Sequence, residues 1–102
     1  MNFVRINVED ARALLATEAG KQAQIVDVRD EQSYAQGHIE SAIHLDNSNL
    51  QNFVETADFD APLIVYCYHG NMSQSAAAYL SAQGFTDAYS LDGGYEAWSA
   101  GF

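Results

Sequence analysis

The chain has 102 residues, of which 48% are apolar, and its four Lys and Arg face 14 Asp and Glu, giving a formal net charge of −10. This length and apolar content predict one globular domain over residues 1–102. The acidic balance disfavours nucleic acid and anionic membrane surfaces as partners, because both attract cationic side chains. No apolar run approaches the roughly 20 residues of a membrane span. Residues 1–6 lack the apolar core of a secretion signal, so we expect a cytoplasmic protein.

Strand-like apolar runs alternate along the chain with helical patterns. Asn7 follows the first run as an N-cap, Gly37 and Gly84 mark helix ends, and residues 63–66 are apolar on both faces, as in a central parallel strand. These repeated strand–helix units predict an α/β fold: a central, mostly parallel five-stranded sheet with helices on both faces. The expected strands are residues 3–6, 24–28, 42–45, 63–66 and 88–91. A first helix is expected after the N-cap Asn7, with Ala11, Leu14 and Leu15 on its buried face, and further helices are expected at about residues 31–37, 49–56, 73–83 and 94–100.

Cys67 is the only cysteine, which excludes an internal disulfide and the Cys-x-x-Cys pattern of redox and zinc sites. The histidines His38, His44 and His69 do not combine with it in a common zinc-binding spacing. We therefore expect neither a bound metal nor a cofactor.

The position of Cys67 nevertheless indicates reactivity. It ends the most buried predicted strand and precedes the longest predicted helix, at the edge where parallel sheets bind ligands. Gly70 lets the intervening loop turn tightly, and the N–H groups of such a loop can form a nest for an anion. The helix N-terminus near Ser73 adds partial positive charge. Because both features lower the pKa of a thiol, we expect a thiolate rather than a small buried apolar residue.

The loop at residues 67–73, Cys-Tyr-His-Gly-Asn-Met-Ser, resembles the active-site loop Cys-x-x-Gly-x-x-Ser of the rhodanese homology domain. Two further motifs stand in the family's order. Residues 27–30, Asp-Val-Arg-Asp, with Gly-His-Ile at 37–39, resemble the upstream motif, and Leu-Asp-Gly-Gly-Tyr-Glu-Ala-Trp at 91–98 resembles the downstream one. The resemblance covers essentially the whole chain and is specific, because it rests on three ordered motifs.

The resemblance implies a sulfurtransferase. The Cys67 thiolate would take the outer sulfur of thiosulfate, and the resulting persulfide would pass that sulfur to cyanide in an assay or to a cellular thiol, with thioredoxin as one candidate. This is covalent double displacement. The residues expected to bind the substrate are those of the loop: Tyr68, His69, Gly70, Asn71, Met72 and Ser73.

Several residues depart from the family pattern or have a structural interpretation. Some relatives have Ser in place of Met72 and Lys in place of Gln74, and many place Arg in the loop, so this loop has no permanent cation. If side-chain charge matters for capturing thiosulfate, the missing cation is expected to weaken its binding. Met72 would instead favour a larger or less charged sulfur donor. We expect Asp27, Arg29 and His38 to support the loops through hydrogen bonds rather than to act in catalysis.

Three alternatives use the same residues. A related phosphatase and arsenate-reductase branch has Cys-x5-Arg, and Ser73 at the sixth position disfavours it, because a phosphoryl dianion calls for a bidentate guanidinium. A non-catalytic rhodanese-like binding module commonly lacks the cysteine that this chain keeps. A persulfide carrier that delivers sulfur to a partner protein needs the same Cys67 chemistry as a small-molecule enzyme, so the sequence leaves both open.

Overall fold

A five-stranded parallel sheet organises the computed structural model, which describes residues 3–101. The strands are ordered β1-β5-β4-β2-β3, and each paired neighbour runs parallel, so the predicted sheet is parallel throughout rather than mostly parallel. The strands are β1 Val4–Ile6, β2 Gln24–Asp27, β3 Ile43–His44, β4 Leu63–Tyr66 and β5 Ala88–Leu91. The helices are α1 Val8–Leu15, α2 Glu31–Gln36, α3 Leu50–Thr56, α4 Met72–Gln83 and α5 Gly94–Ser99, with a short 3₁₀ helix, η1, at Ala19–Gln22.

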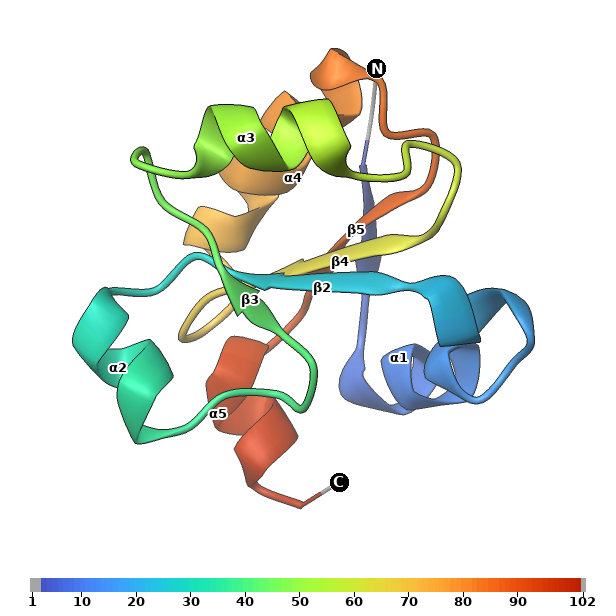
Figure 1. Ribbon diagram of the computed structural model, residues 1–102. Coiled ribbons are helices and arrows are strands. Elements are labelled where there is room, and N and C mark those ends of the chain that lie inside the picture. Colours follow the sequence, from blue (N-terminus) through green and yellow to red (C-terminus); the bar gives the residue numbers. More distant parts are fainter. Residues whose placement is uncertain (1–2, 102) are drawn as a thin grey trace.

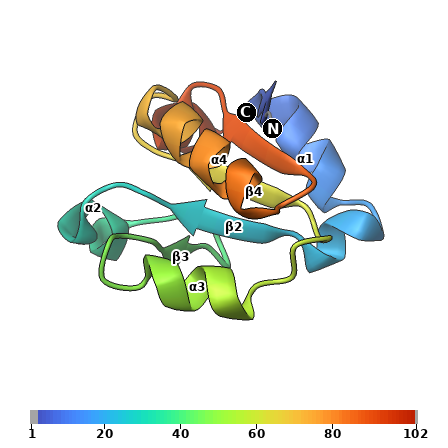
Figure 2. The same ribbon diagram turned by 90° about the horizontal axis from the view of Figure 1, so that it is seen from above.

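Helices cover both faces of the sheet, as predicted. Helices α3 and α4 lie on one face, and α1 and α5 lie on the other (Figure 1). From above, α4 lies over β4 (Figure 2). Each layer has its own core: Phe53, Leu80 and Phe85 belong to the α3–α4 side, and Ala11 and Leu91 to the α1–α5 side. The four residues of β4 are all buried because both layers pack on this central strand.

Most helix and strand ends lie within one residue of the predicted positions. The side chain of Asn7 accepts a hydrogen bond of 2.7 Å from the N–H of Asp10, so the predicted N-cap is confirmed. Helix α4 begins at Met72, one residue earlier than expected, and β3 has only two of the four expected residues.

The η1 helix was not predicted, because residues 16–23 have no apolar periodicity. The Thr17 hydroxyl accepts a hydrogen bond from the N–H of Gly20 at 3.0 Å and so stabilises the start of this turn. A Cβ at Gly20 would lie 1.8 Å from the carbonyl oxygen of Leu14, so only glycine fits here. A local side-chain hydrogen bond and the close approach of Gly20 to the end of α1 shape this segment.

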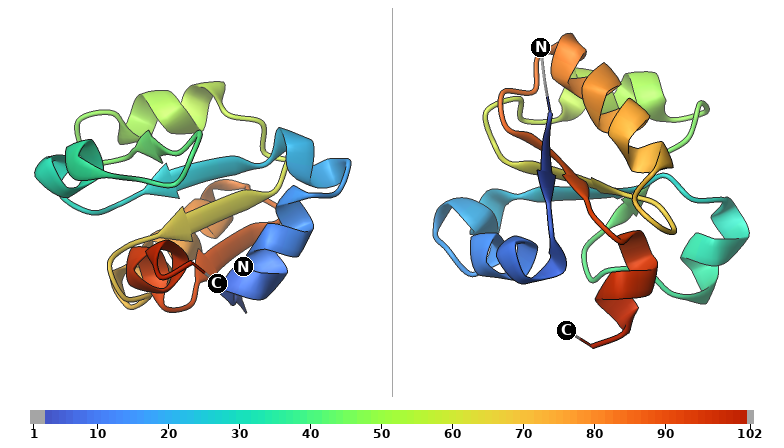
Figure 3. Two further views of the ribbon diagram at one scale, coloured as in Figure 1. Left: turned by 90° about the horizontal axis from the view of Figure 1, so that it is seen from below. Right: turned by 180° about the vertical axis from the view of Figure 1, so that it is seen from behind.

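All strands point the same way, so their carboxyl ends meet at one edge. In the view from below, the arrowheads of β2 and β4 point to the same edge, where the loop between β4 and α4 lies next to α5 (Figure 3). This edge therefore gathers Asp27 from the end of β2, Cys67 after β4 and the β5–α5 turn. No helix between residues 3 and 101 has the length and apolar character needed to cross a membrane.

Candidate active site

Cys67 directly follows β4, and its side chain is surrounded by hydrogen-bond donors. The residue is only 3% exposed. Its Sγ accepts hydrogen bonds from the N–H groups of Gly70 and Ser73, both at 3.3 Å. The Ser73 hydroxyl lies 3.5 Å from the same sulfur. The loop therefore curls around Sγ as an anion nest.

Helix α5 fixes the peptide orientation of this loop. The N–H of Tyr95 donates to the Cys67 carbonyl at 2.8 Å, and the N–H of Glu96 donates to the Tyr68 carbonyl at 3.1 Å. In a trans peptide the N–H points opposite to the C=O. Drawing the Tyr68 carbonyl toward α5 therefore turns the N–H of His69 toward Sγ.

Two glycines permit the close approach of the loop and the β5–α5 turn. Gly70 has φ +97°, and a Cβ there would lie 2.9 Å from the nitrogen of Gly93. Gly94 has φ +58°, and a Cβ there would lie 2.4 Å from the Cys67 carbonyl oxygen. The Gln74 amide donates to the Gly70 carbonyl at 2.9 Å and closes the loop from the α4 side.

The nest sets the acidity of Cys67. Burial opposes ionisation of the thiol, but this effect is outweighed by hydrogen bonds from the Ser73 hydroxyl and from the N–H groups of Ser73, Gly70 and His69. The net result is a pKa lower than that of an ordinary cysteine. A lower pKa raises the fraction of thiolate, which is the nucleophilic form.

Ser90, in β5, is a member of this cluster that the sequence analysis missed. It is fully buried, and its Oγ lies 2.8 Å from the Oγ of Ser73. If Cys67 is a thiol, the cluster contains three protons: one on Sγ and one on each of the two serine hydroxyls. Only two contacts, Sγ–Oγ of Ser73 and Oγ–Oγ between the serines, can hold a proton between them. One proton therefore has no acceptor within the cluster. With a thiolate, Ser90 donates to Ser73 and Ser73 donates to sulfur, and both contacts are filled. The available signal was a small polar residue within the otherwise mostly apolar run at residues 88–91.

Asp27 and Arg29 form a buried ion pair beside the nest. Asp27 is fully buried and Arg29 is 6% exposed. The Arg29 Nη2 donates to Asp27 Oδ2 at 2.7 Å and to the Gly37 carbonyl at 2.6 Å, and its guanidinium lies 4.3 Å from the Tyr95 ring centre. Burial opposes the charge of Arg29, but the bonds to Asp27 outweigh it and raise the pKa of Arg29. Arg29 thus joins β2, the α2 end and α5.

The remaining predicted residues lie at the surface. His38 is exposed, stacks on the Tyr34 ring at 3.9 Å and lies 2.8 Å from the Tyr34 carbonyl through Nδ1, so it anchors the end of α2. His69, also exposed, lies 2.9 Å from Glu96. Asn71 is exposed, and Met72 is 61% exposed.

Tyr68 ties the nest to the start of α2. Its hydroxyl donates to Asp30 at 2.5 Å and contacts Ser33. This bond and the N–H of Ser33 lower the pKa of Asp30 to about 2. The mouth of the nest therefore has the carboxylates of Asp30 and Glu96 near it, while Arg29 is buried and paired. Capture of an anion must rely on N–H groups and hydroxyls.

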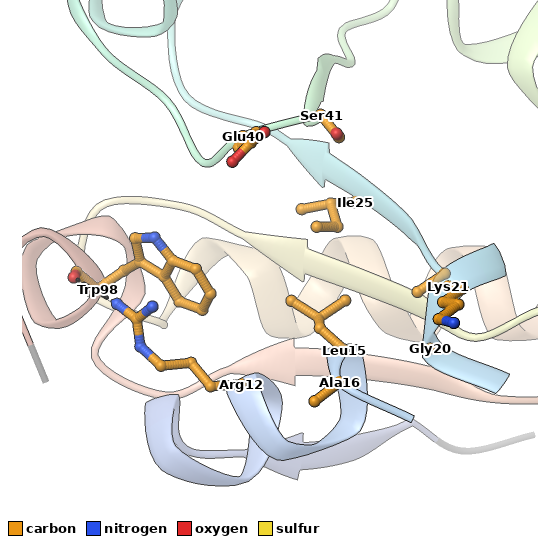
Figure 4. Close-up of a pocket in the computed structure, with 10 residues that line it drawn as sticks. Arg12, Leu15, Ala16, Gly20, Lys21, Ile25, Glu40, Ser41 and Trp98 are labelled. Carbon is orange, nitrogen blue, oxygen red and sulfur yellow. Dashed lines mark hydrogen bonds between the residues drawn. The ribbon is translucent and has the colours of Figure 1, made fainter. Parts of the chain in front are cut away.

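Two hollows lie outside the nest. One, of about 490 Å³, is formed by α1, η1, the start of β2, residues 40–41 and α5, and it contains Arg12 3.9 Å from the Trp98 ring centre (Figure 4). It includes no residue of the loop at 67–73. The other, of about 590 Å³, includes Met72 and so begins at the loop. Within the described residues, no three His, Cys, Asp or Glu side chains gather as a metal site.

Comparisons with known proteins agree with this geometry. The chain is 56% identical over 100 residues to thiosulfate sulfurtransferase GlpE of Ectopseudomonas mendocina, covering 98% of this chain and 88% of that protein. It is 59% identical to GlpE of Pseudomonas fluorescens, covering 94% and 84%. A rhodanese-related protein from Thermoplasma volcanium superposes with a TM-score of 0.78 at 26% identity, covering 98% of this chain and 95% of that one. The rhodanese-like domain profile matches residues 8–101. The chain belongs to the rhodanese-like domain family.

Proposed function

We propose that this protein is a thiosulfate sulfurtransferase in which Cys67 holds the transferred sulfur as a persulfide. One observation carries the proposal: the buried Sγ of Cys67 accepts hydrogen bonds from the loop N–H groups at 3.3 Å, and its pKa is lowered. The names of the relatives that are 56–59% identical support thiosulfate as the sulfur donor.

In the first step, the Cys67 thiolate attacks the outer sulfur of thiosulfate. A bond forms between Sγ and that sulfur, the sulfur–sulfur bond of thiosulfate breaks, and sulfite leaves with the electron pair. No proton and no outside oxidant is needed, because one thiolate and one dianion become one persulfide anion and one dianion. The N–H groups of His69, Gly70 and Ser73, which donate to Sγ, would receive the negative charge in both states.

In the second step, an external acceptor removes the sulfur. Cys67 is the only cysteine of the chain, so the chain offers no second thiol to resolve the persulfide. Cyanide would give thiocyanate, and a cellular thiol, for example that of thioredoxin, would become a persulfide. In both cases the Cys67 thiolate is the leaving group, and its lowered pKa favours departure.

The loop side chains divide into two groups in this mechanism. Ser73 is fully buried and orients the sulfur rather than contacting solvent. Tyr68, His69, Asn71 and Met72 are exposed at the mouth and would meet the sulfite group or the acceptor. Asp27, Arg29 and His38 hold the surrounding loops.

Mass spectrometry after incubation with thiosulfate tests the proposal. We expect an added mass of about 32 Da, one sulfur atom, on Cys67. Cyanide should remove it and release thiocyanate. Cys67→Ser is the matched control, because it keeps the size of the side chain and removes the sulfur. An unmodified Cys67, together with thiocyanate formation by Cys67→Ser, would contradict the proposal. Hydrolysis of p-nitrophenyl phosphate should be absent, because Ser73 occupies the position of the phosphatase Arg.

A further inference from the structure

An apolar groove lies against helix α4, next to the nest. Its volume is about 590 Å³. Met72 and Tyr79 line it although they are 61% and 48% exposed, so two large apolar side chains of α4 face solvent. Their spacing of seven residues puts them on one face of the helix. The groove is completed by Ser75, Ala76 and Leu80 of α4 and by Val28, Leu45, Asp46, Asn47 and Leu50.

The groove borders the loop that forms the nest, because Met72 belongs to both. Met72 lines the groove, and the next residue, Ser73, donates its N–H to the Sγ of Cys67. Tyr79 lies about 10 Å farther along the helix axis, at 1.5 Å per residue. An extended peptide covers about 10 Å in three residues. A bound peptide can therefore place one side chain against Tyr79 while its residue three positions away lies beside Met72, at the mouth of the nest.

The charges around the groove define what it can accept. Asp46 lies in its lining, and hydrogen bonds from Ser48 lower the pKa of that carboxyl, so it is ionised at neutral pH. Asp30 and Glu96 stand near the mouth, whereas the guanidinium of Arg29 is buried against Asp27. Among residues 3–101, no Lys or Arg lines the groove. This surface repels acidic segments and attracts basic ones.

We propose that this groove docks the sulfur acceptor: a basic segment of another protein with a cysteine and, three residues from it, a large apolar side chain. The inference rests on the proposed function and names the class of acceptor. The acceptor thiol loses its proton to solvent, and its thiolate attacks the outer sulfur of the Cys67 persulfide. The bond between that sulfur and Sγ breaks, the Cys67 thiolate leaves, and the acceptor becomes the persulfide.

Synthetic thiol peptides test the proposal. The probe is acetyl-Lys-Cys-Gly-Gly-Leu-Lys-amide, and its controls replace Leu by Ser or both Lys by Glu. With protein carrying the Cys67 persulfide, we expect kcat/KM for the Leu peptide to exceed that for the Ser peptide about tenfold, the effect of burying one Leu side chain. The Glu peptide should be the slowest.

Protein variants locate the effect. Tyr79→Gln keeps a good helix former and should reduce the advantage of the Leu peptide to about threefold or less, with thiocyanate production from cyanide unchanged. Val4→Thr is the matched control, because Val4 is also an exposed apolar residue, at 57%, on the edge strand β1. It should leave the advantage intact.

The outcomes separate the two proposals. If thiosulfate puts no sulfur on Cys67, the proposed function fails and the docking site fails with it. If cyanide removes the sulfur but the Leu and Ser peptides react equally, or Tyr79→Gln and Val4→Thr behave alike, only the docking site is overturned. Self-association in sedimentation that Tyr79→Gln abolishes would also overturn it, by assigning the groove to a second copy of the chain.

Discussion

The two buried groups at the ends of the neighbouring strands β2 and β4 have different kinds of partners. At the end of β2, the carboxylate of Asp27 is matched by the guanidinium of Arg29 at 2.7 Å. After β4, the partners of the Cys67 sulfur within the described part of the chain are N–H groups and a hydroxyl. Both groups are buried, but only the carboxylate of Asp27 faces a full opposite charge.

This difference separates structural support from reactivity. A carboxylate paired with a guanidinium can hold loops together, but the ion pair lowers its nucleophilicity. Neutral donors lower the energy of a thiolate without cancelling its charge, and they remain in place for the charge of a persulfide. Gln74 is uncharged, and its amide donates to the Gly70 carbonyl rather than adding a cation to the loop. The loop is thus ordered without a permanent positive charge.

Breaking the ion pair should have the largest effect on stability. Arg29→Met leaves Asp27 buried without a counter-charge, and we expect the free energy of unfolding to fall by about 3–5 kcal/mol. Urea denaturation followed by circular dichroism measures it. Arg5→Met is the matched control, because its salt bridge with Asp92 is exposed and worth at most about 1 kcal/mol. Equal losses in the two variants would contradict a structural role for the Asp27–Arg29 pair.

Removing the hydroxyl at the nest should act on reactivity instead. Ser73→Ala deletes a hydrogen bond to the thiolate, worth about 1.5–3 kcal/mol, so the pKa of Cys67 should rise by about one to two units. The folded-state pKa is lower than the ordinary value, so the thiolate fraction is lost as pH falls through that lowered pKa. The variant should lose it at a higher pH. The pH dependence of alkylation by iodoacetamide measures this shift, and an unchanged profile would contradict the assigned hydrogen bond.

Ser90→Ala should have the same sign and a smaller size. Ser90 acts through Ser73, 2.8 Å away, so we expect the pKa of Cys67 to rise by less than about one unit. In Ser73→Ala, the additional Ser90→Ala change should shift the pKa no further, since the chain of hydroxyls is already broken. Additive shifts in the double variant would show that Ser90 does not act through Ser73.

The parts of the site that depend on residues close together in the sequence could be predicted. Apolar runs predicted β4 and β5 with the bounds observed, and the strand end, Gly70 and the helix start pointed to Cys67. Ser90 lies 17 residues from Ser73, and the contact of Gly94 with the Cys67 carbonyl joins two different loops. Such pairs depend on strand order and close packing, which spacing along the chain does not encode.

The smallest of these effects is expected at Asp30, whose exposed carboxylate also accepts hydrogen bonds from neutral donors but remains in contact with water. The Tyr68 hydroxyl and the N–H of Ser33 lower its pKa to about 2. Tyr68→Phe should return the pKa toward the ordinary value of about 3.9, as measured by NMR titration of the carboxyl carbon. The stability that this ionised carboxylate contributes is lost as pH falls through the folded-state pKa, so in the variant it should be lost at a higher pH. Cys67 should keep its alkylation profile, because it is bonded to N–H groups and to Ser73 rather than to the Tyr68 ring. If instead the alkylation profile of Cys67 shifted together with the pKa of Asp30, the same hydrogen-bond donors would act on both groups. That result would contradict the separation between the donors of Cys67 and those of Asp30.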